Sequence, residues 1–256
     1  YSVSLNASDG GSSDVETKDN YIRVLPTAAV LPYWEGFEGY TSLENLTNWE
    51  IKNLNNNNAF SLETGFGHTG NKCARLINYG QQPSNIDELI SEPIDMSGIP
   101  ETGQVTLSFR YAYRKRSSSD YEFLKVFISS DCGGDWSQRK TLGGNLLSNQ
   151  VSSSFWAPSS QSDWETIHMG NVFSDFFVEN FRMKFRFEGE GGNNFYLDDI
   201  NLYEGSSSDD IIVGVEELGK NINMTVYPNP TEADMSVVFH LNTAQKMTAQ
   251  ILDVRG

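Results

Sequence analysis

The sequence predicts an all-β protein built around a two-sheet jelly-roll sandwich, with partial immunoglobulin-like β-domains on either side. Apolar residues alternate strictly with polar ones in several stretches, for example Val105, Leu107 and Phe109, as in a strand with one buried face. Clusters of Gly, Asn and Ser separate these short stretches, and no helical period of useful length occurs. The 15 Phe, 11 Tyr and 5 Trp indicate an aromatic core, which suits strands.

Two segments are predicted to be the first and last strands of the sandwich, which covers residues 33–204. The first is Trp34-Glu35-Gly36-Phe37-Glu38-Gly39, and the second is Asn194-Phe195-Tyr196-Leu197-Asp198-Asp199-Ile200. Many strands at turn-punctuated spacing lie between them, which is typical of a two-sheet jelly roll. We therefore expect these two distant segments to be neighbours in the fold.

The strands between these ends have different expected environments. Phe181, Met183, Phe185 and Phe187 alternate with charged residues, so one face of this strand is expected in the core and the other in water. Leu89 to Ser97 is expected to be an edge strand, because Pro93 cannot donate to a ladder. Glu122 to Ser129 is nearly all apolar and is followed by a tight Gly-rich turn at 130–136.

The segments outside the sandwich look like parts of other domains. Residues 1–25 predict a hairpin. Its first strand is the alternating stretch Tyr1 to Ala7, its turn is Asp9-Gly10-Gly11, and its second strand ends with Tyr21 to Val24. Residues 26–32 and 205–221 predict linkers. Residues 222–256 predict the beginning of a further β-domain, whose entry is made rigid by Pro228 and Pro230.

The first two parts of the chain resemble known families. Residues 1–25, with their Gly-rich turn and closing strand, resemble the end of a polycystic-kidney-disease (PKD) type domain. Residues 33–204 are similar to the MAM-like "choice-of-anchor" jelly rolls of large bacterial surface and secreted proteins. The motifs that carry this second resemblance are Glu35-Gly36-Phe37-Glu38, Leu89 to Ser97, Val126 to Trp136 and Asn194 to Ile200.

The last part of the chain resembles a type IX secretion C-terminal sorting domain. Tyr227, Pro228, Asn229 and Pro230 match its opening motif, and Ile251 to Gly256, including Asp253 and Gly256, matches its central strand and turn. The resemblance implies that this domain is truncated at the end of the chain. It also implies two partners, the type IX translocon and its outer-membrane shuttle protein.

Together these resemblances imply the non-catalytic C-terminal region of a large protein. That protein would cross the periplasm and be secreted or anchored on the outer surface of the outer membrane. The order of modules is similar to the tails of pappalysin-like zinc metallopeptidases, so such an enzyme is the expected host, with the jelly roll as an accessory binding module. The alternative is a surface adhesin whose jelly roll binds glycan or protein.

Composition and motifs exclude several other functions. A formal net charge of −16 repels nucleic acid and anionic membranes, and no apolar run is long enough to span a bilayer. His-Glu-x-x-His and Gly-x-Ser-x-Gly are absent. The histidines, His68, His168 and His240, lack metal-ligand spacing. Cys73 and Cys132 form either one disulfide or two buried thiols.

Two binding sites remain as hypotheses. If the end strands pair, Glu38 and Asp199 become neighbours and could hold a structural calcium ion, because hard cations prefer carboxylate and carbonyl oxygens. Alternation places Asp199 on the inward face with Phe195 and Leu197, where a carboxylate needs a cation or hydrogen-bond donors. The second hypothesis is a sugar-stacking face made by Trp136, Trp156 or Trp164, which lie in or beside loops.

Overall fold

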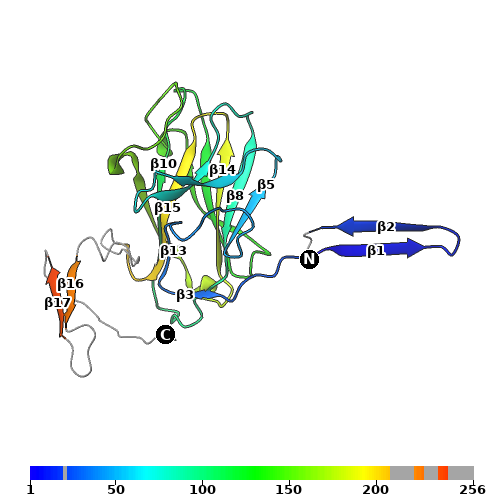
Figure 1. Ribbon diagram of the computed structural model, residues 1–256, viewed down its shortest axis with the longest axis horizontal. Helices are drawn as coiled ribbons and strands as arrows, with labels where there is room; N and C mark the ends of the chain where they lie inside the picture. The colour runs from blue at the N-terminus through cyan, green and yellow to red at the C-terminus, as the bar shows by residue number, and fades with distance from the viewer. Residues whose placement is uncertain (20–21, 208–221, 228–235, 242–256) are drawn as a thin grey trace.

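The structure is a β-sandwich, as the sequence predicts, with a hairpin projecting from it (Figure 1). It is a computed structural model that describes residues 1–19, 22–207, 222–227 and 236–241. The β15 sheet, named for its central strand, has the order β13-β10-β15-β7-β6, with β4 also paired to β15. The β14 sheet has the order β12-β11-β14-β8-β5. All pairings within these two sheets are antiparallel.

The strands of the sandwich are short and are joined by irregular loops. The β15 sheet contains β4 (Tyr33–Glu35), β6 (Phe60–Thr64), β7 (Lys72–Leu76), β10 (Val105–Ala112), β13 (Glu165–Val172) and β15 (Phe195–Glu204). The β14 sheet contains β5 (Trp49–Asn53), β8 (Asn85–Ser91), β11 (Phe123–Ser129), β12 (Ser137–Gly143) and β14 (Arg182–Gly189).

Outside the two sheets, the described elements are small. They are β1 (Val3–Ser8), β2 (Ser13–Lys18), β3 (Ala29–Val30), β9 (Ile94–Asp95), β16 (Ile222–Tyr227) and β17 (Ser236–Leu241), with the 3₁₀ turns η1 (Gly144–Leu146), η2 (Gln161–Asp163) and η3 (Ser174–Phe176). Within the described ranges, no helix is long and apolar enough to cross a membrane.

Aromatic rings join the two sheets across the core. Phe109 of β10 meets Phe185 of β14 edge-on, with ring centroids 5.1 Å apart. Phe187 of β14 stacks on Phe195 of β15 at 4.8 Å. All four side chains are fully buried, and such ring pairs add to the hydrophobic gain from burial. The alternation predicted for β10 and β14 is thereby confirmed on their inward faces.

The predicted pairing of the first and last strands is confirmed. β4 pairs with the second half of β15, where Glu35 lies opposite Ile200. β7 pairs with the first half, where Ala74 lies opposite Leu197. Strand β15 is therefore bordered by two short strands in succession, and Asp198 and Asp199 fall at the junction between them.

The outer face of β14 is more buried than the sequence predicts. Arg182 and Lys184 are each only 5% exposed. Arg182 donates to the carbonyl of Ser91 and pairs with Glu50, while Lys184 pairs with Glu88 at 3.0 Å. Ion pairing between strands of the same sheet thus lets these charged side chains lie buried, because each charge has a partner.

Strand β8 is not an edge strand, contrary to the prediction from Pro93. It lies between β14 and β5 and ends at Ser91. Pro93 falls in the bend that follows, so the missing N–H is not needed by the ladder.

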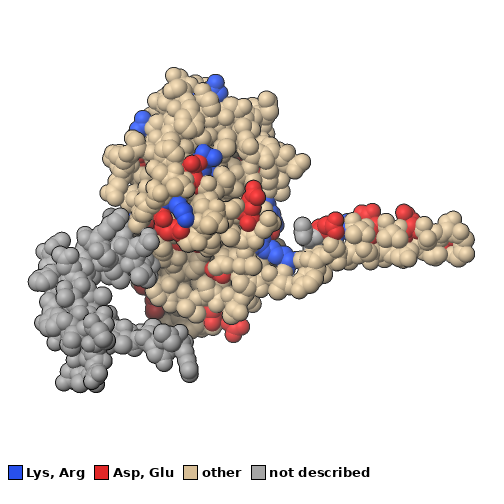
Figure 2. Space-filling view, in the orientation of Figure 1, with Lys and Arg blue, Asp and Glu red and all other residues tan. Residues whose placement is uncertain are grey.

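The N-terminal segment also differs from the prediction. The second strand of the hairpin is β2, and beyond it Ile22 and Tyr1 exchange two backbone hydrogen bonds. The predicted linker contains β3, which pairs in parallel with β9, and Arg23 donates to the carbonyls of Leu46, Thr47 and Trp49. On the face seen in Figure 2, acidic side chains line one edge of the hairpin, whereas both signs of charge are interspersed over the sandwich.

Candidate functional site

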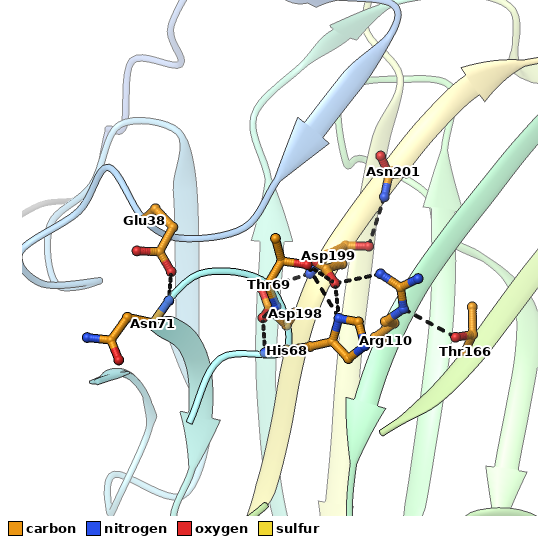
Figure 3. A network of polar contacts seen from close by, with 9 residues as sticks. All are labelled: Glu38, His68, Thr69, Asn71, Arg110, Thr166, Asp198, Asp199 and Asn201. Carbon is orange, nitrogen blue, oxygen red and sulfur yellow. Dashed lines mark hydrogen bonds and ion pairs between the residues drawn. The ribbon is translucent and has the colours of Figure 1, made fainter. Parts of the chain in front are cut away.

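The junction between β4 and β7 is filled by a loop and a network of polar contacts (Figure 3). Asp198 accepts hydrogen bonds from the backbone N–H groups of His68 at 2.7 Å and Thr69 at 3.4 Å. These residues belong to the loop between β6 and β7, so a carboxylate from β15 holds the loop in the gap where neither short strand reaches. Burial, followed by the charge of neighbouring Asp199, raises the pKa of Asp198 well above its usual range.

A β-bulge places Asp199 differently from the prediction. Ser108 lies opposite Asn201, and Arg110 lies opposite Asp198, so Asp199 and Ile200 together oppose the single residue Phe109. Asp199 adopts a φ of 48°. The bulge shifts the alternation, so that Ile200 and not Asp199 continues the inward face of Leu197. The predicted inward position of Asp199 is therefore wrong.

The carboxylate of Asp199 instead accepts three side-chain donors on the outer side of the sheet. One oxygen, Oδ2, lies 2.7 Å from Arg110 Nη1 and 2.8 Å from both His68 Nδ1 and Thr69 Oγ1. Burial alone would raise the pKa of Asp199, but these hydrogen bonds and the charge of Arg110 outweigh it and lower the pKa. Arg110 thus supplies the positive charge beside this carboxylate.

Glu38 lies beyond the end of β4 and has other partners. Its carboxylate accepts the backbone N–H groups of Asn71 and Lys72, both at 2.6 Å. The ammonium of Lys72 donates to the carbonyls of Glu38 and Tyr40 at 2.8 and 2.7 Å. Figure 3 shows Glu38 and Asp199 on opposite sides of the β6–β7 loop. The junction as it stands therefore holds the sheet together through protein donors.

The structure does not bring Glu38 and Asp199 into one set of ligands. A calcium ion shared by them would have to displace Arg110 or the two amides, because calcium takes six to eight oxygens. Among the described residues, no group of three or more His, Cys, Asp or Glu side chains is arranged to hold a metal. Calcium binding stays a prediction.

The other predicted site residues are separated from this junction. Cys73 and Cys132 are free thiols; one lies on β7 and the other in the turn after β11, so they belong to different sheets. Of the predicted sorting residues, Tyr227 ends β16, whereas Pro228, Asn229, Pro230, Asp253 and Gly256 lie outside the described residues.

The three tryptophans proposed for sugar stacking are covered by other side chains. Trp164 is 8% exposed and packs in a small cluster with Tyr196. Arg114 lies over the ring of Trp156 at 4.7 Å, and the ammonium of Lys184 lies over Trp136 at 4.5 Å. Trp164 is therefore buried, and Trp156 and Trp136 each have a cationic side chain over the ring.

Tyr121 is an exposed aromatic residue that lines a hollow. It lies just before β11, is 59% exposed, and lines a hollow of about 400 Å³. One edge of the hollow is formed by Gly143 and Gly144, and a Cβ added to Gly144 would lie 2.4 Å from the ring of Tyr121. The ring therefore rests against a glycine backbone and contacts Phe123 edge-on at 5.1 Å.

Polar groups surround the ring of Tyr121 in the same hollow. Ser118, Asp120, Asn145 and Lys115 all line it. Asp120 uses Oδ2 to accept the N–H groups of Arg116 and Ser117, which fixes the loop before Tyr121. Asn145 Oδ1 accepts a hydrogen bond from the ammonium of Lys115 at 2.5 Å, which leaves the amide N–H groups of Asn145 available. An exposed ring among fixed polar groups is the chemistry that binds a sugar.

The strands and loops beside this hollow are held by buried asparagines. The side-chain oxygen of Asn194 accepts hydrogen bonds from the backbone N–H groups of Asn78 and Tyr79. The side chain of Asn193 accepts a hydrogen bond from the backbone N–H of Trp156 and donates one to the carbonyl of Ser152. Glu122, directly after Tyr121, accepts the N–H of Gly192 and is 1% exposed. Such anchoring fixes the hollow before any ligand arrives, which lowers the entropic cost of binding.

A larger hollow of about 640 Å³ lies between edge strands β5 and β6. Its two aromatic residues, Trp49 and Phe60, are 1% and 2% exposed, so neither ring is available for stacking. Exposed asparagines such as Asn57 and Asn58 line it instead. The hollow at Tyr121 is therefore the better candidate for a sugar.

Sequence reasoning missed Tyr121, although a signal for it was present. Residues 122–129 were expected to form one strand with little distinction between its faces. Alternation from the buried Leu124 and Val126 places Tyr121 and Phe123 on the other face. Tyr121 also follows the polar run Ser117-Ser118-Ser119-Asp120, which marks it as part of a loop rim.

Comparison with known proteins supports the fold. No family model matches the chain, and no curated protein matches it. Among solved structures, the K2 cleaved adhesin domain of Lys-gingipain is similar with a TM-score of 0.51 and 16% identity, over 68% of this chain and 99% of that one.

Two further solved structures are more distant. The K1 cleaved adhesin domain of Lys-gingipain from Porphyromonas gingivalis W83 has a TM-score of 0.47 and 14% identity, over 68% of this chain and 98% of that one. TmCBM61 in complex with β-1,4-galactotriose has a TM-score of 0.39 and 14% identity, over 61% and 88%. At such identities the likeness concerns the fold alone, and the sandwich has the all-β fold of the K2 adhesin domain.

Proposed function

We propose that this chain is a glycan-binding, adhesin-type jelly-roll module of an extracellular or surface protein, and that it does not itself catalyse a reaction. The observation that carries the proposal is the ring of Tyr121, exposed over a hollow of about 400 Å³ and held against Gly144. A flat, fixed ring beside free hydroxyl and amide groups matches the apolar face and the hydroxyls of a sugar.

The test is a glycan array followed by calorimetric titration of the best binder, using the full chain. Tyr121→Ala removes the stacking ring and is expected to abolish measurable binding. Phe173→Ala is the matched control, because Phe173 is exposed to a similar degree, 57%, and does not line the hollow. An array without any hit would reject the glycan and favour a protein ligand for the same module.

A more specific proposal concerns the protein to which the module belongs. It rests on the resemblance of residues 1–25 to a PKD-type domain, of residues 33–204 to MAM-like jelly rolls, and of residues 222–256 to a type IX sorting domain. The host would be either an adhesin or a zinc metallopeptidase, exported through the type IX translocon and received by its outer-membrane shuttle.

The sorting proposal has its own experiment. Deletion of the chain from residue 222 onward in the natural host is expected to leave the protein in the periplasm, while the jelly roll still binds its ligand. Normal export of the deleted protein would contradict a sorting role for this segment and would leave the binding proposal untouched.

A further inference from the structure

Lys115 differs from the other buried lysine of the described chain in having no counter-charge. Lys115 is 4% exposed and Lys184 is 5% exposed. The ammonium of Lys184 pairs with Glu88 at 3.0 Å. That of Lys115 meets only the neutral Asn145 amide oxygen. A buried charge is stable when it is paired, and an ammonium has three donors, so Lys115 has unused capacity for an anion.

The position of Lys115 connects this capacity to the binding hollow. Lys115 lines the same hollow as Tyr121 and Asn145. Its backbone is fixed by hydrogen bonds with Gln150 and Ser152, so the side chain starts from a rigid point. The acidic residue in the hollow, Asp120, is committed to the N–H groups of Arg116 and Ser117 through one of its oxygens and forms no ion pair with Lys115.

We infer that the ligand of this hollow is an acidic sugar, whose ring stacks on Tyr121 and whose carboxylate pairs with the ammonium of Lys115. This inference rests on the proposed glycan-binding function and adds the chemical class of the ligand. A carboxylate would supply the missing counter-charge, and a charge-assisted hydrogen bond in a sheltered site is stronger than a neutral one. Hexuronic acids and sialic acids both carry such a carboxylate on a sugar ring.

The net charge of the protein alone predicts the opposite preference. At −16, the field of the whole molecule opposes the approach of an anion. If only this general field acted, a neutral sugar would bind better than its acidic counterpart. A preference for the acid must therefore come from a local positive charge. Salt screens the long-range repulsion more than a sheltered contact, so the preference is expected to persist at high salt.

The experiment compares each acid with its own methyl ester, which keeps the ring and removes the charge. Galacturonic acid oligomers and sialyllactose, each with its ester, are titrated against the full chain at low and high salt. The acid of one pair is expected to bind about tenfold or more tightly than its ester. The pair that shows this difference identifies the class of acidic sugar.

Variants assign the difference to Lys115. Lys115→Met keeps the apolar stem and removes the charge, so it is expected to make acid and ester bind equally. Lys125→Met is the control, because Lys125 is already paired with Glu188 and lies outside the hollow. If the Lys115 variant does not fold, the comparison of acid and ester on the unaltered protein still decides the matter.

The outcomes separate this inference from the function on which it rests. Equal binding of acid and ester, with binding lost in Tyr121→Ala, would overturn the acidic ligand and leave a glycan-binding module. The absence of binding by any acid, ester or array glycan would overturn both. A preference for acid that survives in Lys115→Met would overturn the role given to Lys115.

Discussion

Arg110 and Asp199 form an ion pair across the bulge in the pairing of β10 with β15, with Arg110 Nη1 2.7 Å from the carboxylate. The Asp199 side chain is only 1% exposed and that of Arg110 is 18% exposed. The pair lies where β4 and β7 both end beside β15, so it stabilises a point that neither short strand covers. Its contribution is therefore larger than that of an ion pair on an open surface.

Removal of the Arg110 charge is expected to destabilise the sandwich strongly. Arg110→Met leaves the buried carboxylate of Asp199 without its permanent cation, which costs about 3–5 kcal/mol. Denaturant unfolding measures this loss. Lys125→Met is the control, since the Lys125–Glu188 pair has both side chains 23% exposed, and we expect its loss to cost about 1 kcal/mol or less. Equal losses in the two variants would show that the Asp199 pair has no special role.

Gly144 is expected to control ligand binding through the position of Tyr121. Gly144→Ala introduces a Cβ 2.4 Å from the Tyr121 ring at a φ of 54°, so the ring must move. Gly80→Ala is the matched control, because Gly80 has a φ of 75° and nothing within 4 Å of its added Cβ. Both variants should lose about 1 kcal/mol or more of stability from a left-handed residue. Only Gly144→Ala should lose glycan binding, measured by titration.

The sandwich could be predicted from the sequence, and the polar junction could not. Period-2 alternation in Val105 to Tyr111 and in Phe181 to Phe187 depends on one strand at a time, which is why it identified the core faces. The position of Asp199 depends on a bulge, and one inserted residue shifts the face of each residue that follows. Alternation from Phe195 therefore failed beyond Leu197, and the partners of Asp199 were missed with it.

The hollow at Tyr121 was missed for a similar reason. Tryptophan is the largest aromatic side chain, so Trp136, Trp156 and Trp164 attracted the stacking hypothesis. Yet Lys184 lies over the ring of Trp136 and Arg114 over that of Trp156, while Trp164 is buried against Tyr196. The position of the Tyr121 ring depends on Gly144, which follows β12 and is distant in sequence. No local pattern connects these two residues.

The calcium prediction for Glu38 and Asp199 is tested by calorimetry. If an ion replaces Arg110 as the partner of Asp199, chelation with EDTA will lower the melting temperature, added calcium will restore it, and Asp199→Asn will lose the response. A melting temperature that is unchanged by EDTA would refute the ion. Arg110 would then be left as the charge that balances Asp199 in solution.

Asp87 is expected to make stability fall as the pH rises. It lies on β8, is 1% exposed, and has one carboxylate oxygen without a hydrogen-bond partner. Burial raises its pKa from 3.8 to about 7. The folded state therefore holds this proton more tightly than the unfolded chain, so the stabilisation is complete below about pH 4 and is lost as the pH passes 7. Solvent screening keeps the loss below the roughly 4 kcal/mol that the whole shift in pKa would represent.

Substitution by asparagine removes this titration without changing the shape of the side chain. Asp87→Asn should flatten the dependence of unfolding free energy between pH 4 and 7 and make the protein more stable than the unaltered chain at pH 8. Asp95→Asn is the control of opposite sign. Ser97 donates two hydrogen bonds to Asp95 and lowers its pKa, so this carboxylate stabilises the fold at neutral pH and loses its effect on acidification. If Asp87→Asn follows the pH profile of the unaltered protein, the Asp87 carboxyl is ionised and solvated in the fold.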